Sequence, residues 1–186
     1  LIIFAGVAVA GSAVIAGATR RQQESAYTSV LEMYSGNLEK ELEQIDDFLL
    51  ESIMIEGNAR DILESTADLD RYLAEIRMKN SFEETTGHME HLSGVVWYAP
   101  DLDVRVKMVR SKEDILGKKL QQTLDQIIRT AEEEEKTDWF FSHVEENNYL
   151  VRILENRGTY MMAWIDTAVI YESVREALPE EKAPPA

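Results

Sequence analysis

The sequence predicts an α+β fold in which a membrane-spanning helix continues into a long helix and then an antiparallel sheet of about five strands with flanking helices. Three observations support this fold class. Residues 1–19 carry no charge. Apolar residues then recur at helical spacing from Tyr27 to Ile53. Beyond Gly94, short runs of β-branched and aromatic residues alternate with turn residues.

The uncharged run at 1–19 predicts a transmembrane anchor. Nineteen helical residues span about 28 Å, close to the roughly 30 Å hydrocarbon thickness of a bilayer. Two other interpretations stay open. The run is also compatible with a buried core helix or with a cleaved signal sequence, because Ala16-Gly17-Ala18 fits a small-x-small cleavage pattern. Arg20-Arg21 end the run, but the charges of one flank do not decide its orientation.

Residues 20–56 are predicted to form a long juxtamembrane helix. The apolar side chains repeat every eleven residues, a period typical of a nearly straight packed helix. They are Tyr27, Leu31, Tyr34, Leu38, Leu42, Ile45, Leu49 and Ile53. The helix either packs on its own domain or extends the membrane span and pairs with a second copy of itself, which would make the chain a homodimer.

Gly57-Asn58 marks a break, and residues 59–78 are predicted to form a second helix. Its expected apolar face consists of Ile62, Leu63, Leu69, Tyr72, Leu73 and Ile76. Ser81 and Glu84 fit a capping box, which predicts a short third helix ending near His91.

The remaining pattern alternates between strands and helices. Strands are expected at 95–101, 104–110, 139–146, 149–156 and 159–166, the first two as a hairpin and the last two joined by a tight turn at Asn156-Arg157-Gly158. Residues 111–136 return to helical spacing, with Ser111 and Asp114 as the expected N-cap arrangement. A terminal helix is expected at 167–178. Residues 57–178 therefore read as one domain, followed by an acidic and Pro-rich tail at 179–186.

Composition excludes several classes of function. The 186-residue chain has a net charge of −16 at pH 7, which argues against binding to nucleic acid, because phosphate contacts need basic patches. It contains no cysteine, so disulfides, thiolate metal sites and thiol nucleophiles are absent. No catalytic motif is present. His88 and His91 lie three residues apart but are expected at the surface, so we expect no catalytic residue, metal or cofactor.

Strand alternation places aromatic and polar side chains together on single faces of the predicted strands. An arginine and aromatic rings that converge on a concave face would suit a carboxylate or an amphipathic small ligand of unknown identity. The alternative is that the aromatic rings are core and Arg152 is at the surface. The candidate ligand-binding residues are Trp97, Trp139, His143, Arg152, Tyr160, Trp164 and Asp166.

Two stretches carry a family resemblance. HLSGVVWYAPDLD, from residue 91, is similar to the first strand and loop, and YLVRILENRGTYMMAWIDTAVIYESV, from residue 149, is similar to the closing hairpin and exit helix, of one sensor fold. With the order of elements over residues 1–178, the chain resembles the extracytoplasmic Cache (PAS-like) sensor region of bacterial membrane-bound sensor histidine kinases. No tyrosine-arginine amino-acid-binding signature of double-Cache relatives is present, so no binding residue is carried over.

The resemblance implies a dimeric signal-sensing domain at the cell membrane, with residues 22–186 extracytoplasmic. It also implies that kinase activity resides in a cytoplasmic part outside this sequence, so the chain itself is not expected to be an enzyme. The same architecture serves chemoreceptors and cyclic-dinucleotide enzymes. A further alternative is a structural membrane protein that assembles through its long helix and senses nothing.

Overall fold

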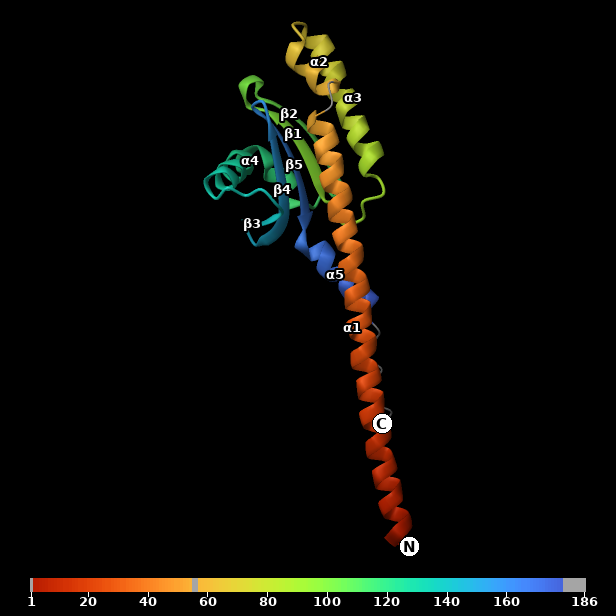
Figure 1. The fold of residues 1–186 in the computed structure, drawn as a ribbon. Helices are drawn as coiled ribbons and strands as arrows, with labels where there is room; N and C mark the ends of the chain where they lie inside the picture. Colours follow the sequence, from red (N-terminus) through yellow and green to blue (C-terminus); the bar gives the residue numbers. More distant parts are fainter. Residues whose placement is uncertain (1, 55–56, 179–186) are drawn as a thin grey trace. The chain divides into compact units, whose positions relative to one another are not determined.

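The computed structural model describes residues 2–54 and 57–178, with side chains described from Tyr27 onward. The chain divides into two units, Leu1–Lys40 with Glu172–Ala186, and Glu41–Tyr171. The second unit contains the whole sheet and is an α+β domain, as predicted (Figure 1).

Helix α1, Ile2–Met54, crosses from the first unit into the second. The last members of its eleven-residue repeat, Ile45, Leu49 and Ile53, are all buried in the core against the sheet. This part of the helix therefore packs on its own domain. By contrast, Leu31, an earlier member of the same repeat, is 47% exposed.

No helix in the described part of the chain combines the length and the apolar character needed to cross a membrane. The backbone is helical from Ile2, but the predicted anchor at 1–19 falls on residues whose side chains lie outside the described ones. The tail at 179–186 is also outside the described residues.

The predicted helix at 59–78 is wrong in its bounds, because two helices occupy the region: α2, Asn58–Glu64, and α3, Asp68–Thr86. The backbone is extended at Ser65, which ends α2. The carbonyl of Ser65 accepts a 3.0 Å hydrogen bond from the guanidinium of Arg71. Ser81 does not cap a new helix but lies inside α3. The helix continues past it, and the next residue, Phe82, packs edge-on against Phe48 of α1.

The predicted apolar face of this region is also largely wrong. Ile62 is buried, but the other five members are exposed: Leu63, Leu69, Tyr72, Leu73 and Ile76. The face of α3 that packs on the domain is instead formed by Ala74, Met78 and Phe82. The helix thus carries one apolar stripe inside and a second outside.

The sheet confirms the predicted strands and hairpins. It contains β1 (Gly94–Ala99), β2 (Val104–Val109), β3 (Phe140–Val144), β4 (Asn147–Asn156) and β5 (Thr159–Asp166), all antiparallel, in the order β2-β1-β5-β4-β3. Arg157 and Gly158 both have positive φ, as a two-residue type I′ turn requires. A short 3₁₀ turn, η1 (Pro100–Leu102), joins β1 to β2.

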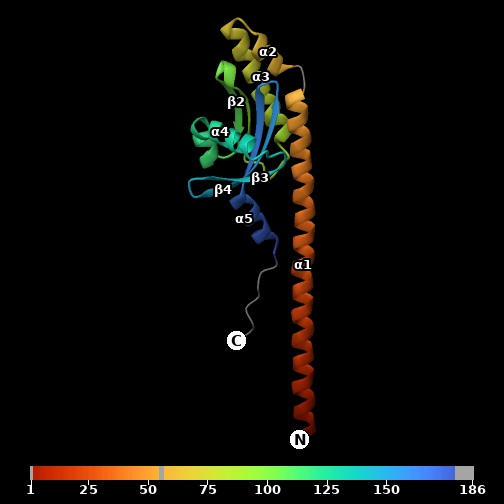
Figure 2. The same ribbon diagram turned by 60° about the vertical axis from the view of Figure 1, so that its left-hand side comes forward.

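Helices cover both faces of the sheet (Figures 1 and 2). The end of α1 and helix α3 cover one face, around Val95, Trp97 and Met161. Helix α4, Ile115–Glu133, covers the other face with a stripe of Leu116, Leu120, Leu124, Ile127 and Ile128. Helix α5, Thr167–Ala177, follows β5 without an intervening residue.

Gly94 is required by this packing. A Cβ built there would lie 2.2 Å from Cζ2 of Trp164, on a ring that is fully buried and has no room to move. We expect Gly94→Ala to destabilise the domain by about 1 to 3 kcal/mol through overpacking. Urea denaturation followed by tryptophan fluorescence measures the effect, since Trp97 and Trp164 are both buried.

Gly87→Ala is the matched control in the same unit. A Cβ there meets only backbone oxygens at 3.4 Å or more, so its stability should change by less than about 0.5 kcal/mol. Equal effects of the two substitutions would contradict the role assigned to Gly94.

Candidate functional site

The sheet separates the seven predicted ligand-binding residues onto two faces, because paired residues of neighbouring strands point to the same side. Tyr160, Trp164 and Asp166 lie on the face covered by α4. Trp97, His143 and Arg152 lie on the opposite face, by their register with Met161, Asn148 and Ala163. Trp139 precedes β3 and packs against the core on this second side. The seven side chains therefore do not share one face, although Arg152 and Tyr160 line the same hollow of about 340 Å³ beside the end of α4.

Trp164 is a core residue. Its ring is fully buried, and its Nε1 donates a 2.6 Å hydrogen bond to Oδ2 of Asp114. Asp114 is the N-cap residue of α4, as predicted, but its carboxylate makes no capping bond. The bond to Trp164 instead ties the start of α4 to the centre of the sheet.

Tyr160 and Asp166 also have structural partners. The Tyr160 hydroxyl donates a 2.7 Å hydrogen bond to Oε1 of Glu132 near the end of α4. That bond, together with burial and the charge of Glu132, raises the pKa of Tyr160 to about 12. Asp166 accepts a 2.9 Å bond from the backbone N–H of Ala168 and so holds the first turn of α5.

On the other face, Trp97 lies in the core and Arg152 forms an ion pair. Nε of Arg152 is 2.9 Å from Oδ1 of Asp46 on α1, and the side chains are only 13% and 28% exposed. Arg152 also donates to the carbonyl of Thr137, before β3. This arginine therefore connects α1, β4 and the segment between α4 and β3.

His91 forms a second connection to α1, although it was expected at the surface. It is 8% exposed, its backbone N–H donates a 2.8 Å hydrogen bond to Oε1 of Glu41, and its Nδ1 lies 2.5 Å from Oε2 of the same carboxylate. Glu41 is fifty positions away from His91 in sequence, so the local spacing of residues could not indicate this pair.

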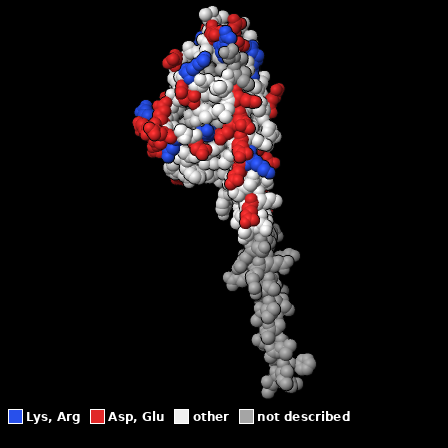
Figure 3. Space-filling model, viewed as in Figure 1, with Lys and Arg blue, Asp and Glu red and all other residues white. Residues whose placement is uncertain are grey.

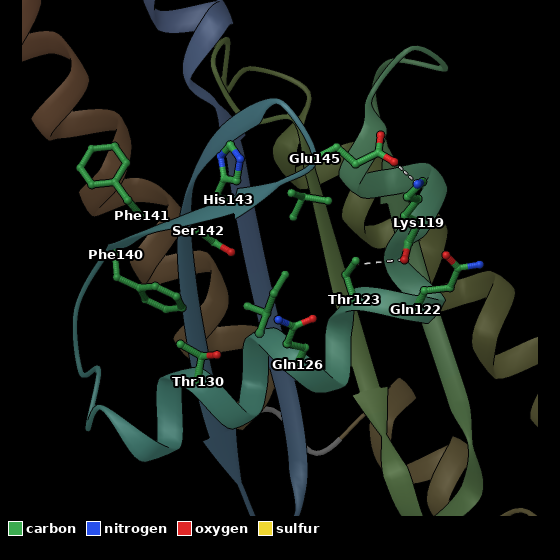
Figure 4. A pocket seen from close by; sticks show the side chains of 12 residues that line it. Lys119, Gln122, Thr123, Gln126, Thr130, Phe140, Phe141, Ser142, His143 and Glu145 are labelled. Atoms are coloured by element: carbon green, nitrogen blue, oxygen red, sulfur yellow. Dashed lines mark hydrogen bonds and ion pairs between the residues drawn. The ribbon is translucent and has the colours of Figure 1, made fainter.

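His143 borders a second hollow, at the edge of the sheet. The imidazole is exposed, with Nδ1 3.0 Å from the side-chain oxygen of Asn148. The hollow is a groove of about 410 Å³ between α4 and β3 (Figure 4). Its walls are β3 with Glu145 on one side and, on the other, Lys119, Gln122, Thr123, Gln126, Ile127 and Thr130 of α4.

The charges in this groove neutralise each other. Lys119 forms an ion pair with Glu145 across it, and the Thr123 hydroxyl donates to the Lys119 carbonyl at 3.1 Å. Gln122, Gln126 and Thr130 add neutral hydrogen-bonding groups to the lining, and Phe140 and Val144 add apolar side chains. The groove therefore suits a neutral polar ligand, and we take it as the candidate binding site.

The sequence did not predict the groove, because strand alternation indicates only which side chains of one strand share a face, and one wall of the groove is a helix. The available signal was the polar stripe of α4, where Lys119, Thr123, Gln126 and Thr130 recur at helical spacing opposite the leucine stripe. A polar helix stripe is ordinarily a solvent face, and only the position of β3 makes it the wall of a groove.

No group of three or more His, Asp or Glu side chains among the described residues is arranged to hold a metal ion. Acidic side chains dominate the face seen in Figure 3, with a dense group at the α4 side, in keeping with the net charge of −16. No protein-family model, curated protein or solved structure matches the chain.

The Tyr160–Glu132 bond predicts a pH dependence. Since the pKa is raised in the folded state, the contribution to stability is complete below the usual tyrosine pKa of about 10 and is lost as pH rises towards 12. We expect Glu132→Gln, which keeps an acceptor but removes the charge, to lower the pKa of Tyr160. Difference titration of tyrosinate absorbance between variant and wild type measures it. Glu133→Gln is the control, and an unchanged titration in Glu132→Gln would contradict the assignment.

The Arg152–Asp46 pair predicts coupling without any ligand. In a double-mutant cycle with Arg152→Ala and Asp46→Ala, we expect a coupling free energy of about 1 to 3 kcal/mol, because the bond is charge-assisted and shielded. Chemical denaturation of the four proteins gives the value. Arg129→Ala on α4, which has no ion pair among the described residues, serves as the control. Coupling near zero would leave Arg152 free for another role.

Proposed function

We propose that the chain is the extracytoplasmic sensing domain of a membrane-anchored receptor, of the kind that the Cache (PAS-like) resemblance implies. In this proposal residues 1–19 anchor the chain, residues 22–186 lie outside the cell, and two copies associate through the long helix. The observation that supports it is the place of β5. This strand is central in the sheet, packs against the end of α1 and runs directly into α5.

A cue at the sheet can therefore reach both helices that lead out of the domain. A ligand in the α4–β3 groove touches β3, and among the described strands β3 pairs with β4 alone. From β4, Arg152 contacts Asp46 of α1, and the next strand is β5. Signalling of this kind requires that the ligand prefer one of two arrangements, and a coupling of roughly 1 to 3 kcal/mol is usual.

The output of the receptor belongs to sequence outside this chain. A sensor histidine kinase is our first choice, and a chemoreceptor or a cyclic-dinucleotide enzyme fits the same sensing domain. In each case the chain itself catalyses nothing and the signalling enzyme or adaptor lies across the membrane.

One observation favours a different class, a structural protein that assembles and senses nothing. Four apolar side chains of α3 are exposed in a single helical stripe: Leu69, Tyr72, Leu73 and Ile76. If assembly is the function, Tyr72→Glu should lower the mass of the wild-type assembly, and no signalling output should depend on the α1–sheet contacts.

The sensor proposal predicts that breaking the α1–sheet ion pair changes output. Residues 1–178 would be joined to the second span and cytoplasmic part of a histidine kinase with a transcriptional reporter. We expect Arg152→Ala and Asp46→Ala to shift basal reporter activity in the same direction by about fivefold or more, the lower end of usual allosteric coupling. Arg129→Ala should leave it unchanged, and equal activity in all variants would contradict the proposal.

The same cells test topology, because the chain contains no cysteine. A cysteine at exposed Glu133 should react with a membrane-impermeant thiol reagent on intact cells. A cysteine at Ala131, which is 6% exposed, should react only after denaturation. Labelling of the Glu133 position only after lysis would reverse the proposed orientation.

A further inference from the structure

Strand β3 is an edge strand, and its outer backbone groups have no partner among the described residues. It pairs with β4 through a two-residue turn, and Val144 faces Asn147 at that turn. In such a hairpin, bonded and non-bonded pairs alternate, so Phe140, Ser142 and Val144 bond to β4. The N–H and C=O groups of Phe141 and His143 therefore point away from the sheet. No hydrogen bond to these four groups is present among the described residues.

Strand β3 lacks most of the usual protections of a sheet edge, although α4 lies beside it. Proteins guard edges with lysine, proline, bulges or a covering helix. The opposite edge strand, β2, carries Arg105 and Lys107 and is contacted by α3. The sequence of β3, FFSHV, has no proline or basic residue other than histidine, and its ladder to β4 runs without a bulge.

Both sides of this edge offer contacts to an incoming strand. On the α4 side lies the groove of about 410 Å³, lined by every residue of β3 and by the polar stripe of α4. On the other side, Phe141 is 76% exposed, unusual for so large an apolar side chain. Successive side chains of an added strand would enter the groove and cover Phe141 in turn.

We propose that the α4–β3 groove binds an extended peptide segment, which adds as a sixth strand along β3. The alternating N–H and C=O groups of Phe141 and His143 are matched by another extended backbone and by no compact small molecule. The neutral wall of Gln122, Gln126 and Thr130 accepts polar side chains of the peptide, and Phe141 accepts an apolar one. This names the ligand class for the sensor site proposed above.

A second copy of the chain is not the occupant we choose, and that choice rests on the proposed function. Two antiparallel β3 edges would be related by a two-fold axis perpendicular to the sheet. Such an axis reverses every direction within the sheet plane, including that of the end of α1, which packs flat on one face. Two copies anchored in one membrane need these helices to run the same way.

The probe is a fluorescent synthetic peptide with the sequence of Asn147–Asn156, the strand that already pairs with β3 in the fold. We expect saturable binding to the full chain and slowed amide exchange at Phe141 and His143, with exchange at Ser142 unchanged because that amide is already bonded to β4. His143→Pro removes one outward donor and should weaken binding roughly tenfold, the effect of one hydrogen bond.

A second variant guards against misfolding of His143→Pro. Gln126→Trp fills the groove from an exposed position on α4 and should also weaken binding, whereas Gln121→Trp, exposed but not lining the groove, should not. Absence of binding, or binding that neither variant weakens, would overturn the proposal. Concentration-dependent dimerisation through β3, lost in His143→Pro, would overturn it in favour of a second copy. Because the binding measurement does not use the transcriptional reporter, a negative result for peptide binding leaves the signalling proposal to its own test, and the reverse also holds.

Discussion

The arrangement of the domain depends on the position of one side chain, Trp164. Its ring lies across the centre of the sheet, where only a glycine at 94 leaves room, and its Nε1 bonds to Asp114 at the start of α4. Gly117 allows the same close approach, since a Cβ there would lie 2.6 Å from Val109. Helix α4 is thereby held near β2 and β5 at its start. Its residues from Lys119 to Thr130 line the groove along β3, and Glu132 near its end bonds to Tyr160 of β5. The groove exists because of this orientation.

The opposite face is held by polar pairs as well as by apolar packing. Arg152–Asp46 and His91–Glu41 connect α1 to the sheet and to the loop before β1, each from a position far away in sequence. A buried charged pair adds less to stability than to geometry, because desolvation offsets much of the attraction.

The strands were predictable from the sequence because a strand reports its period within a few residues, as TYMMAWID and the Asn156-Arg157-Gly158 turn do. The face of α3 was not predictable. Its largest apolar residues lie outside, and the packed face is chosen by Phe48 and other partners distant in sequence. The distribution of the candidate site residues over the two faces was not predictable for a related reason. Alternation says which residues of one strand share a face, but the face on which Arg152 meets Tyr160 or Trp164 depends on register between strands.

Side chains fill the centre of both faces of the sheet, which limits where a ligand could bind to this domain. Trp164 and its neighbours fill the centre of the space under α4, and Trp97 fills the space under α1. The hollows along α4 therefore lie at its margins, beside β3 and beside Arg152 and Tyr160. In the proposed mode of binding, a strand added along the β3 edge would displace no core side chain, and β4, which pairs with β3, carries the arginine that bonds to α1. A ligand bound at the β3 edge would therefore be connected to α1 through two contacts, the pairing of β3 with β4 and the Arg152–Asp46 ion pair.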